Sequence, residues 1–553
     1  LISQPGLMVG ANDVAMAIRD FPRPFYTNVN DLQAVSQRAN SAVASVWDGT
    51  ARLITSILKK KALRPRMVRW LARAVALQRG REKSHRSIFR ESSDAFSLNL
   101  FATHLRLFQP LMKSNPATGE WTMLEKIRGD FFLSPSVAST AMQGVQELFP
   151  ASPINLPRLH HSSDASAEWP SAEDISTATT EASMSFPTQC FFLTSMCMHL
   201  SFAPVIRHLE MLQTNLFSPM MHHHGRDSPV VRGVLSVQFV RQIEASNPDL
   251  LTRAVQFCSF QASWLLRAIG MNTALTSTSS SFSSSSSSSW RPRASTPSSL
   301  SRIPLCMLED LVTVMSYLGR ACFQSRHFSS KLANGEVVPN LSISCTPILR
   351  VLVAFLAGGN TYVANPGVRT NIGDVFFLCF FDHMLVHNDD GQGLPTRTVS
   401  SDPSNQPMLP TSLLNDPEIV PLLLPALLEV YGDAEHTGFY DAPKHRKMLT
   451  IVIRFLLAQQ QHRDALLART ITTASISENK SSEEGSNSTR TFSFISSANG
   501  LMNQANSSIT DGMSKLQAIK SYQDASRDHV VWQGRSEEER KQQETEFEQD
   551  ENA

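Results

Sequence analysis

Apolar residues recur at helical spacing through most of this chain. Between residues 96 and 111 the large apolar side chains fall on one face of a helix, and residues 67–75 repeat that spacing in a basic segment. The same pattern predicts helices at residues 187–213, 249–270, 305–324, 347–357, 373–386, 418–431, 446–468 and 494–525. Strict alternation of apolar and polar residues, which indicates a strand, is nearly absent. The sequence therefore predicts an all-α protein.

Four polar segments interrupt the helical pattern. They cover residues 150–185, 276–301, 387–412 and 473–490, and the second contains eleven Ser between residues 277 and 289. Such segments cannot bury an apolar face, so we expect disordered or looped insertions within one architecture. Helices connected in this way predict an elongated solenoid of stacked helix pairs or triplets. No repeat of about 40 residues is readable, so any armadillo-like repeat is degenerate.

Composition excludes several classes of protein. Hydrophobic residues make up 42% of the 553 residues, which is enough to build a core and excludes a wholly disordered chain. No apolar run approaches the roughly 18 residues that cross a bilayer, so no membrane span is expected. The chain does not begin with Met, and it stops after a charged segment without a helix cap. We therefore expect it to be a fragment of a longer protein.

The seven cysteines indicate neither a disulfide framework nor a zinc site. Their number is odd, they are widely spaced, and no two form a C-x-x-C pair. They are Cys190, Cys197, Cys258, Cys306, Cys322, Cys345 and Cys379. Most lie in apolar strings, where a buried and unreactive thiol is the ordinary interpretation. This usage fits the cytoplasm or the nucleus, so the N-x-S/T sequons at Asn340, Asn479, Asn487 and Asn506 are interpreted as chance matches.

Short motifs of catalysis and nucleotide binding are missing. The sequence contains no P-loop, dinucleotide-binding, nucleophile-elbow, zincin or EF-hand pattern. The triplet His222, His223 and His224 could hold a metal, but no carboxylate or Cys stands at ligand spacing, which favours a solvated loop. His199 and His208 lie on different turns of one predicted helix, where packing or surface roles are expected. No catalytic, cofactor-binding or metal-binding residue is predicted.

Two opposed charge blocks are concealed by the net charge of +1. Residues 51–90 carry thirteen Lys or Arg against one acid, whereas residues 536–552 carry eight acids against two bases. The sharpest basic cluster consists of Lys59, Lys60, Lys61, Arg64, Arg66 and Arg69. It could be a nuclear import signal or a phosphate-contacting stripe; the alternative is a solvated face of a helix that ends at Trp70–Leu71. The absence of interleaved aromatic residues disfavours nucleic-acid binding. The acidic block predicts an exposed helix with pairs such as Glu537–Lys541.

Several strings resemble the ubiquitin conjugation factor E4 family. The segment from Ser93 to Leu100 resembles S-D-G-F-x-L-N-L, with Ala95 in place of the usual Gly. Residues 186–194 are similar to F-P-T-E-x-F-F-L-T, with Gln189 in place of Glu. Further matches are Trp70-Leu71-Ala72 with Arg81 and Lys83, Asn365-Pro366 with Arg369, Phe439-Tyr440-Asp441 with Arg446, and the Glu-Glu-Glu-Arg run at 537–540. Their order and spacing identify residues 23–553 as the core region, truncated at its C-terminal end, which leaves residues 1–22 as an N-terminal extension.

The resemblance implies an armadillo-like core followed by a U-box. In this family the U-box binds a ubiquitin-conjugating enzyme and orients its ubiquitin thioester for attack by a lysine of acceptor ubiquitin. The family extends ubiquitin chains on ubiquitinated substrates for proteasomal degradation, together with an AAA ATPase segregase and proteasome shuttle factors. Residues 1–553 contain no D-P-I-M…D-P-V…L-P pattern of a U-box.

From this resemblance we expect the chain to be a scaffold that is inactive alone and needs no cofactor. The alternative is a non-enzymatic helical-repeat scaffold or transport-type adaptor. The coding sequence downstream of residue 553 distinguishes the two, because only the first hypothesis requires a U-box there.

Overall fold

The structure is a computed structural model, and it describes most of the predicted helices. The described residues are 29–78, 81, 94–114, 121–128, 185–211, 245–271, 303–324, 341–380, 415–434, 441–468, 494–527, 536–539 and 541. They fall in two compact units, the first up to Leu467 and the second from Ala468 onwards. Apart from the isolated bridge between Ser114 and Trp121, every regular element in these ranges is helical, so the all-α prediction is confirmed.

The described part of the first unit contains four successive helix pairs. The first helices of the pairs are α4 (Asp94–Phe108), α12 (Pro248–Ala268), α15 (Leu341–Tyr362) and α19 (Val420–Asp433). The second helices are α8 (Phe186–Cys197), which continues as the π-helix η5 (Met198–Phe202) and α9 (Ala203–Met211), then α13 (Cys306–Gln324), α16 (Pro366–Phe380) and α20 (Asp441–Ala458). The short 3-10 turns η2 (Gln109–Leu111) and η3 (Leu124–Lys126) follow α4.

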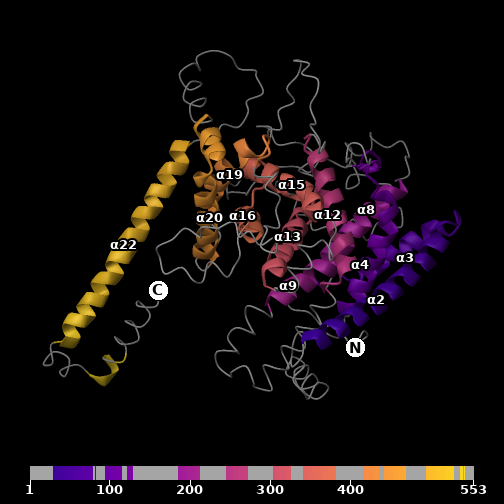
Figure 1. Ribbon diagram of the computed structural model, residues 1–553, viewed down its shortest axis with the longest axis horizontal. Coiled ribbons are helices and arrows are strands. Elements are labelled where there is room, and N and C mark those ends of the chain that lie inside the picture. Colours follow the sequence, from indigo (N-terminus) through magenta and orange to yellow (C-terminus); the bar gives the residue numbers. More distant parts are fainter. Residues whose placement is uncertain are drawn as a thin grey trace, which may run out of the picture. The chain divides into compact units, whose positions relative to one another are not determined.

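These pairs stack into two layers (Figure 1). In one layer α4 contacts α12, α12 packs on α15, and α15 packs on α19. In the other layer α9 and η5 contact α13, α13 packs on α16, and α16 packs on α20. Each pair thus contacts its neighbours in chain order, which is the architecture of a helical-repeat solenoid built from helix pairs.

The intervals between pairs explain why no repeat is readable in the sequence. The first helices begin at Asp94, Pro248, Leu341 and Val420, so the repeat length changes from one pair to the next. The predicted insertions at 276–301, 387–412 and 473–490 lie outside the described residues, as does the segment 1–22. Only Ser185 of the predicted insertion 150–185 is described.

Two helices, α2 (Val29–Leu58) and α3 (Arg64–Ala76), precede the stacked pairs. Helix α2 was not predicted, although Trp47, Ala51, Ile54 and Leu58 are buried at helical spacing along one face. It packs on α3 and α4. Helix α3 covers the basic segment predicted at residues 67–75, and Leu71, Ala74 and Val75 of that pattern are buried.

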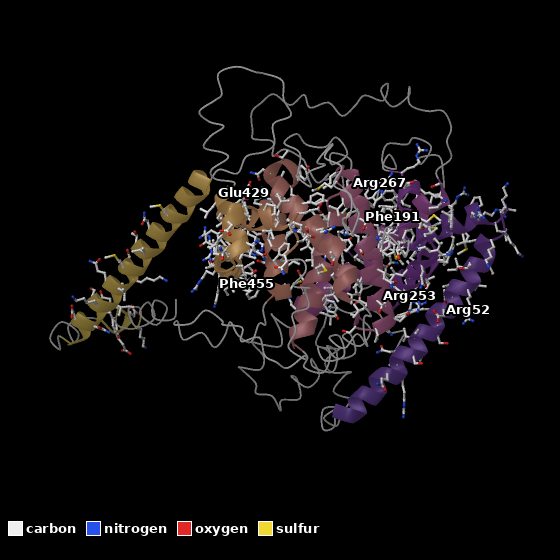
Figure 2. All side chains as sticks on the ribbon, turned by 45° about the horizontal axis from the view of Figure 1, so that its top comes forward. Arg52, Phe191, Arg253, Arg267, Glu429 and Phe455 are labelled. Carbon is white, nitrogen blue, oxygen red and sulfur yellow. The ribbon has the colours of Figure 1, made fainter. Side chains whose placement is uncertain are left out.

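An aromatic cluster fills the interior where α4, α8 and α12 meet. The ring centroid of Phe108 lies 5.3 Å from that of Phe257 and 5.2 Å from that of Phe260, both in edge-on geometry. The Phe191 ring is fully buried and lies 5.3 Å from the Trp264 ring. Figure 2 labels Phe191 on the helical bundle. Each such side chain contributes roughly 2–3 kcal/mol from burial, and its aromatic contacts add to this. The cluster therefore anchors the first pairs to each other.

Glycines allow close approach within the α13–α16–α20 layer. A Cβ built on Gly319 would lie 2.9 Å from Leu378 Cβ and 3.0 Å from the Leu378 carbonyl oxygen. A Cβ on Gly373 would lie 2.6 Å from Leu449 Cδ2. The absence of a side chain at these two positions lets each helix of the layer lie directly against the next.

Local signals set the helix starts. Ser185 accepts a hydrogen bond from the Thr188 N–H to cap α8, and Asn247 Oδ1 accepts from the N–H groups of Asp249 and Leu250 to cap α12. Proline follows directly in the first turn of both helices, where its missing N–H has no cost.

The second unit contains α22 (Phe494–Arg527) and the start of the acidic segment. Ser536 and Glu539 form a reciprocal capping box, in which Ser536 Oγ accepts from the Glu539 N–H at 3.3 Å and Glu539 Oε2 accepts from the Ser536 N–H at 3.0 Å. Lys541 Nζ lies 3.3 Å from Glu537 Oε1, which confirms the predicted ion pair. The sequon residue Asn506 lies exposed on α22.

Candidate functional site

Two strings that carry the family resemblance meet at Arg81, together with the helix that begins with a third. Its guanidinium forms an ion pair with Asp94 at the start of α4, and both side chains are almost fully buried. Arg81 Nε also donates a hydrogen bond of 3.2 Å to the carbonyl oxygen of Leu200 in η5. One side chain therefore connects the segment after α3, helix α4 and the helix that begins with the F-P-T string.

Pro204 explains why the Leu200 carbonyl accepts a hydrogen bond from Arg81. In an α-helix the Leu200 carbonyl would accept from the N–H of residue 204, but residue 204 is Pro and has none. The chain responds with a π-turn over Met198–Phe202, which accommodates the Pro within one continuous helix. The Arg81 guanidinium then supplies a donor to the buried oxygen from outside the helix.

A second buried arginine joins α2, α4 and α12. Arg106 Nε lies 2.5 Å from Asp48 Oδ1, and another of its nitrogens contacts Asp249. Its guanidinium lies 5.1 Å from the centroid of the Trp47 ring, within cation–π range. The hydrogen bond from Arg106 holds the pKa of Asp48 below its usual value. Trp47 in turn donates to Asn99 Oδ1 at 2.6 Å, so α2 is fixed to α4 by two polar contacts.

The later pairs are joined by buried histidine and arginine contacts. His199 Nδ1 lies 3.0 Å from Asp310 Oδ1, which links η5 to α13. This contact gives His199 the packing role expected from the sequence, whereas His208 on α9 is only half-buried. The other links join α16 to α20 through His445 and Asp374 at 2.7 Å, and α16 to α19 through Arg369 and Asp433 at 2.8 Å.

Burial raises the pKa of Asp374, and the hydrogen bond from His445 only partly offsets this. The N-P-x-x-R string forms the start of α16. Its Asn365 Oδ1 caps this helix by accepting from the Gly367 N–H at 2.9 Å, and its Arg369 pairs with Asp433 of α19. Arg81, Arg106 and Arg369 thus join neighbouring helices through buried polar contacts, and we call these contacts joints. None of these contacts forms an open site.

The described thiols are unsuited to nucleophilic chemistry. Six cysteines are free and buried, as predicted, and they are Cys190, Cys197, Cys258, Cys306, Cys345 and Cys379. Burial raises the pKa of Cys190, Cys197 and Cys345 to about 12, so thiolate is essentially absent near neutral pH. The side chain of Cys322 lies outside the described residues. Among the residues that the structure describes, no group of three or more His, Cys, Asp or Glu could hold a metal ion, and the triplet His222–His224 falls outside them.

Helix α3 and the turn before it carry an exposed basic surface. Lys59, Lys60, Lys61, Arg66 and Arg69 are exposed, as the solvated-face interpretation predicts. Arg64 differs, because its Nε donates to the Leu58 carbonyl at 3.0 Å and its guanidinium lies 5.5 Å from the Phe186 ring centroid.

Trp70 lies within this basic surface and is 55% exposed. One aromatic residue next to the basic cluster is not the interleaving that single-strand binders need, so the expectation about nucleic acid stays a prediction.

Among the residues that the structure describes, one helical segment is long and apolar enough to cross a membrane. It runs from Phe186 to Glu210, and 94% of its most apolar window is buried inside the protein. The expectation that no apolar run reaches this length is thus wrong for the α8–η5–α9 segment. The burial is that of a core helix, since the same residues pack on α4, α12 and α13.

Comparison with models of protein families identifies the family of this chain. A family model described as ubiquitin elongating factor core matches residues 7–553, which includes most of the segment expected to be an N-terminal extension. A search of curated proteins finds no significant match.

Proposed function

Because this chain belongs to the ubiquitin elongating factor core family, we propose that it is the scaffold of a ubiquitin chain-elongating ligase. Ubiquitin and ubiquitin-conjugating enzymes are general partners of this family. The match over residues 7–553 is the observation that carries the proposal. The buried thiols, with pKa values near 12 at three positions, agree with a chain that carries no covalent ubiquitin.

In this proposal the residues of the chain act by positioning. The joints at Arg81, Arg106 and Arg369 hold successive helices at fixed separation, so the solenoid presents bound partners in a defined geometry. Holding an acceptor ubiquitin close to a charged conjugating enzyme raises the effective concentration of the attacking lysine. The docking surface for that enzyme would be a U-box outside residues 1–553.

The finer partners follow from the resemblance to the E4 family. We propose an AAA ATPase segregase and proteasome shuttle factors as partners, ubiquitinated proteins bound for degradation as substrates, and the cytoplasm and nucleus as locations. Each of the partners and substrates requires a surface that is not used by the buried contacts between helices. The outer face of α3 is such a surface.

A chain-elongation assay tests the proposal. It contains activating enzyme, conjugating enzyme and a ubiquitin-fused substrate, and it compares residues 1–553 with the full-length protein. We expect the full-length protein to build chains and residues 1–553 to stay at the background of the conjugating enzyme alone. Chain building by residues 1–553 would overturn the scaffold role, and an inactive full-length protein would favour a transport-type adaptor.

A further inference from the structure

Helix α3 presents two different faces. Val68, Leu71, Ala72 and Val75 are buried against the rest of the first unit. On the outer face, Arg66, Trp70, Arg73 and Leu77 follow one another at spacings of four, three and four residues, which places them in one row along the helix. Arg69 lies beside this row. We call these five residues the α3 row; it is about 16 Å long at 1.5 Å per residue.

The apolar members of the α3 row are exposed. Trp70 is 55% exposed and Leu77 is 68% exposed, whereas other apolar residues of this segment are buried. Scattered single apolar residues are common on surfaces, whereas Trp70 and Leu77 lie in one row with arginines. Trp and Arg are the residue types that most often dominate the binding energy of protein interfaces. An exposed Trp between arginines on a rigidly packed helix therefore has the composition of an interface.

The charge of this surface is one-sided. Residues 51–78 contain eight Lys or Arg and no acidic residue. In the part of the chain that the structure describes, no ion pair involves Arg66, Arg69, Arg73 or the lysines of the turn at 59–61. Among the described residues these positive charges have no acidic partner, and their shared sign favours an acidic ligand.

The pattern of the row selects among acidic ligands. Single-stranded nucleic acid is held by several stacking aromatics in succession, whereas this row contains one. A membrane-bound helix inserts a continuous apolar face, whereas Trp70 and Leu77 are separated by Arg73. Acidic side chains on both sides of a single apolar side chain would match the arginines and Trp70 together.

We propose that the α3 row, with the lysine turn at 59–61, binds an acidic peptide segment of a partner protein. An apolar side chain of that segment packs on Trp70, and its carboxylates pair with Arg66, Arg69 and Arg73. This binding does not require any ligase activity of the chain. Its test is therefore independent of the proposed function.

Fluorescence anisotropy with residues 1–553 tests this directly. The probe is a labelled peptide of about 12 residues, long enough to cover the row, with Glu at alternate positions and one central Leu. Two further peptides replace the Glu residues by Gln or the Leu by Ser. Labelled single-stranded RNA and phosphatidylserine vesicles are titrated in parallel.

Two row variants are compared with a matched control. Trp70→Ala removes the aromatic contact, and the double change Arg69→Glu/Arg73→Glu reverses the charge. Because Lys447 and Arg454 are exposed on α20, Lys447→Glu/Arg454→Glu changes the net charge equally at another place. All changed side chains are exposed, and far-ultraviolet circular dichroism checks that the helical content is unchanged.

We expect saturable binding of the acidic peptide that weakens with salt and with loss of its Leu. Trp70→Ala should weaken it about tenfold, which is typical of a central interface residue, and the row charge reversal should abolish it. The control should bind within about twofold of the unchanged protein, because its charges lie away from the row. Equal loss in the control, no saturable binding, or tighter row-dependent binding of RNA or vesicles would overturn the proposal.

Discussion

Replacing Arg81 by Met is expected to destabilise the first unit strongly. The side chains of Arg81 and Asp94 are 1% and 2% exposed, so the change leaves a carboxylate in the interior without its cation. Breaking a buried ion pair from one side costs about 3–5 kcal/mol, and the Leu200 carbonyl also loses the donor at 3.2 Å. We therefore expect a loss of about 4–5 kcal/mol in the free energy of unfolding.

Urea denaturation followed by circular dichroism measures this loss. The double variant Arg81→Met/Asp94→Leu removes both charges and should recover all but about 1–2 kcal/mol, a remainder that includes the lost hydrogen bond to Leu200. Arg267→Met is the matched control, because the Arg267–Glu125 pair is 50% and 78% exposed and such pairs contribute less than about 1 kcal/mol. If Arg81→Met costs no more than Arg267→Met, Arg81 is not a joint of the fold.

Three further changes test the packing and the buried histidine by the same denaturation measurement. Phe191→Ala should cost about 3–5 kcal/mol because it empties the aromatic cluster, whereas Phe96→Ala at a half-exposed position should cost much less; similar losses would contradict the cluster's role. Gly319→Ala should cost about 1–3 kcal/mol through its clash with the neighbouring helix, while Gly432→Ala, which meets nothing within 4 Å, should be neutral or stabilising. Burial lowers the pKa of His104 to about 4, so its folded form stays neutral while the unfolded chain gains a proton below its ordinary value of 6.5. Stability should therefore fall as the pH drops from about 6.5 to about 4, and between about pH 7 and pH 5 the unchanged protein should lose about 2 kcal/mol more than His104→Leu; equal losses would show that His104 does not titrate on unfolding.

The helical class was predictable because the apolar period is local. Helix α12 begins at Pro248, one residue before the predicted start, since Asn247 and Pro248 are ordinary start signals. Helix α15 begins at Leu341, six residues before the predicted start, and Pro347 lies inside it and not at its first turn. Helix α2 was missed although its buried face has helical spacing, because that face is short relative to its 30 residues.

The joints could not be predicted because they depend on tertiary contacts. Nothing in the sequence indicates that Arg81 would meet Leu200 across 119 positions, or that His199 would meet Asp310 across 111. The resemblance marked Arg81 and Asp94 in separate strings. Their ion pair, and the contact of Arg81 with Leu200, depend on the packing of α4 against η5. The exposure of Trp70 likewise depends on which face of α3 the neighbouring helices cover.

We propose that this chain positions ubiquitin without carrying it covalently, and its cysteines allow a direct test. Residues 1–553 are incubated with ubiquitin-charged conjugating enzyme and resolved on a nonreducing gel. Because the described cysteines are buried, with pKa values raised to about 12 at Cys190, Cys197 and Cys345, we expect no adduct that is lost on reduction. A reducible ubiquitin adduct that disappears when one cysteine is changed to Ser would contradict the claim.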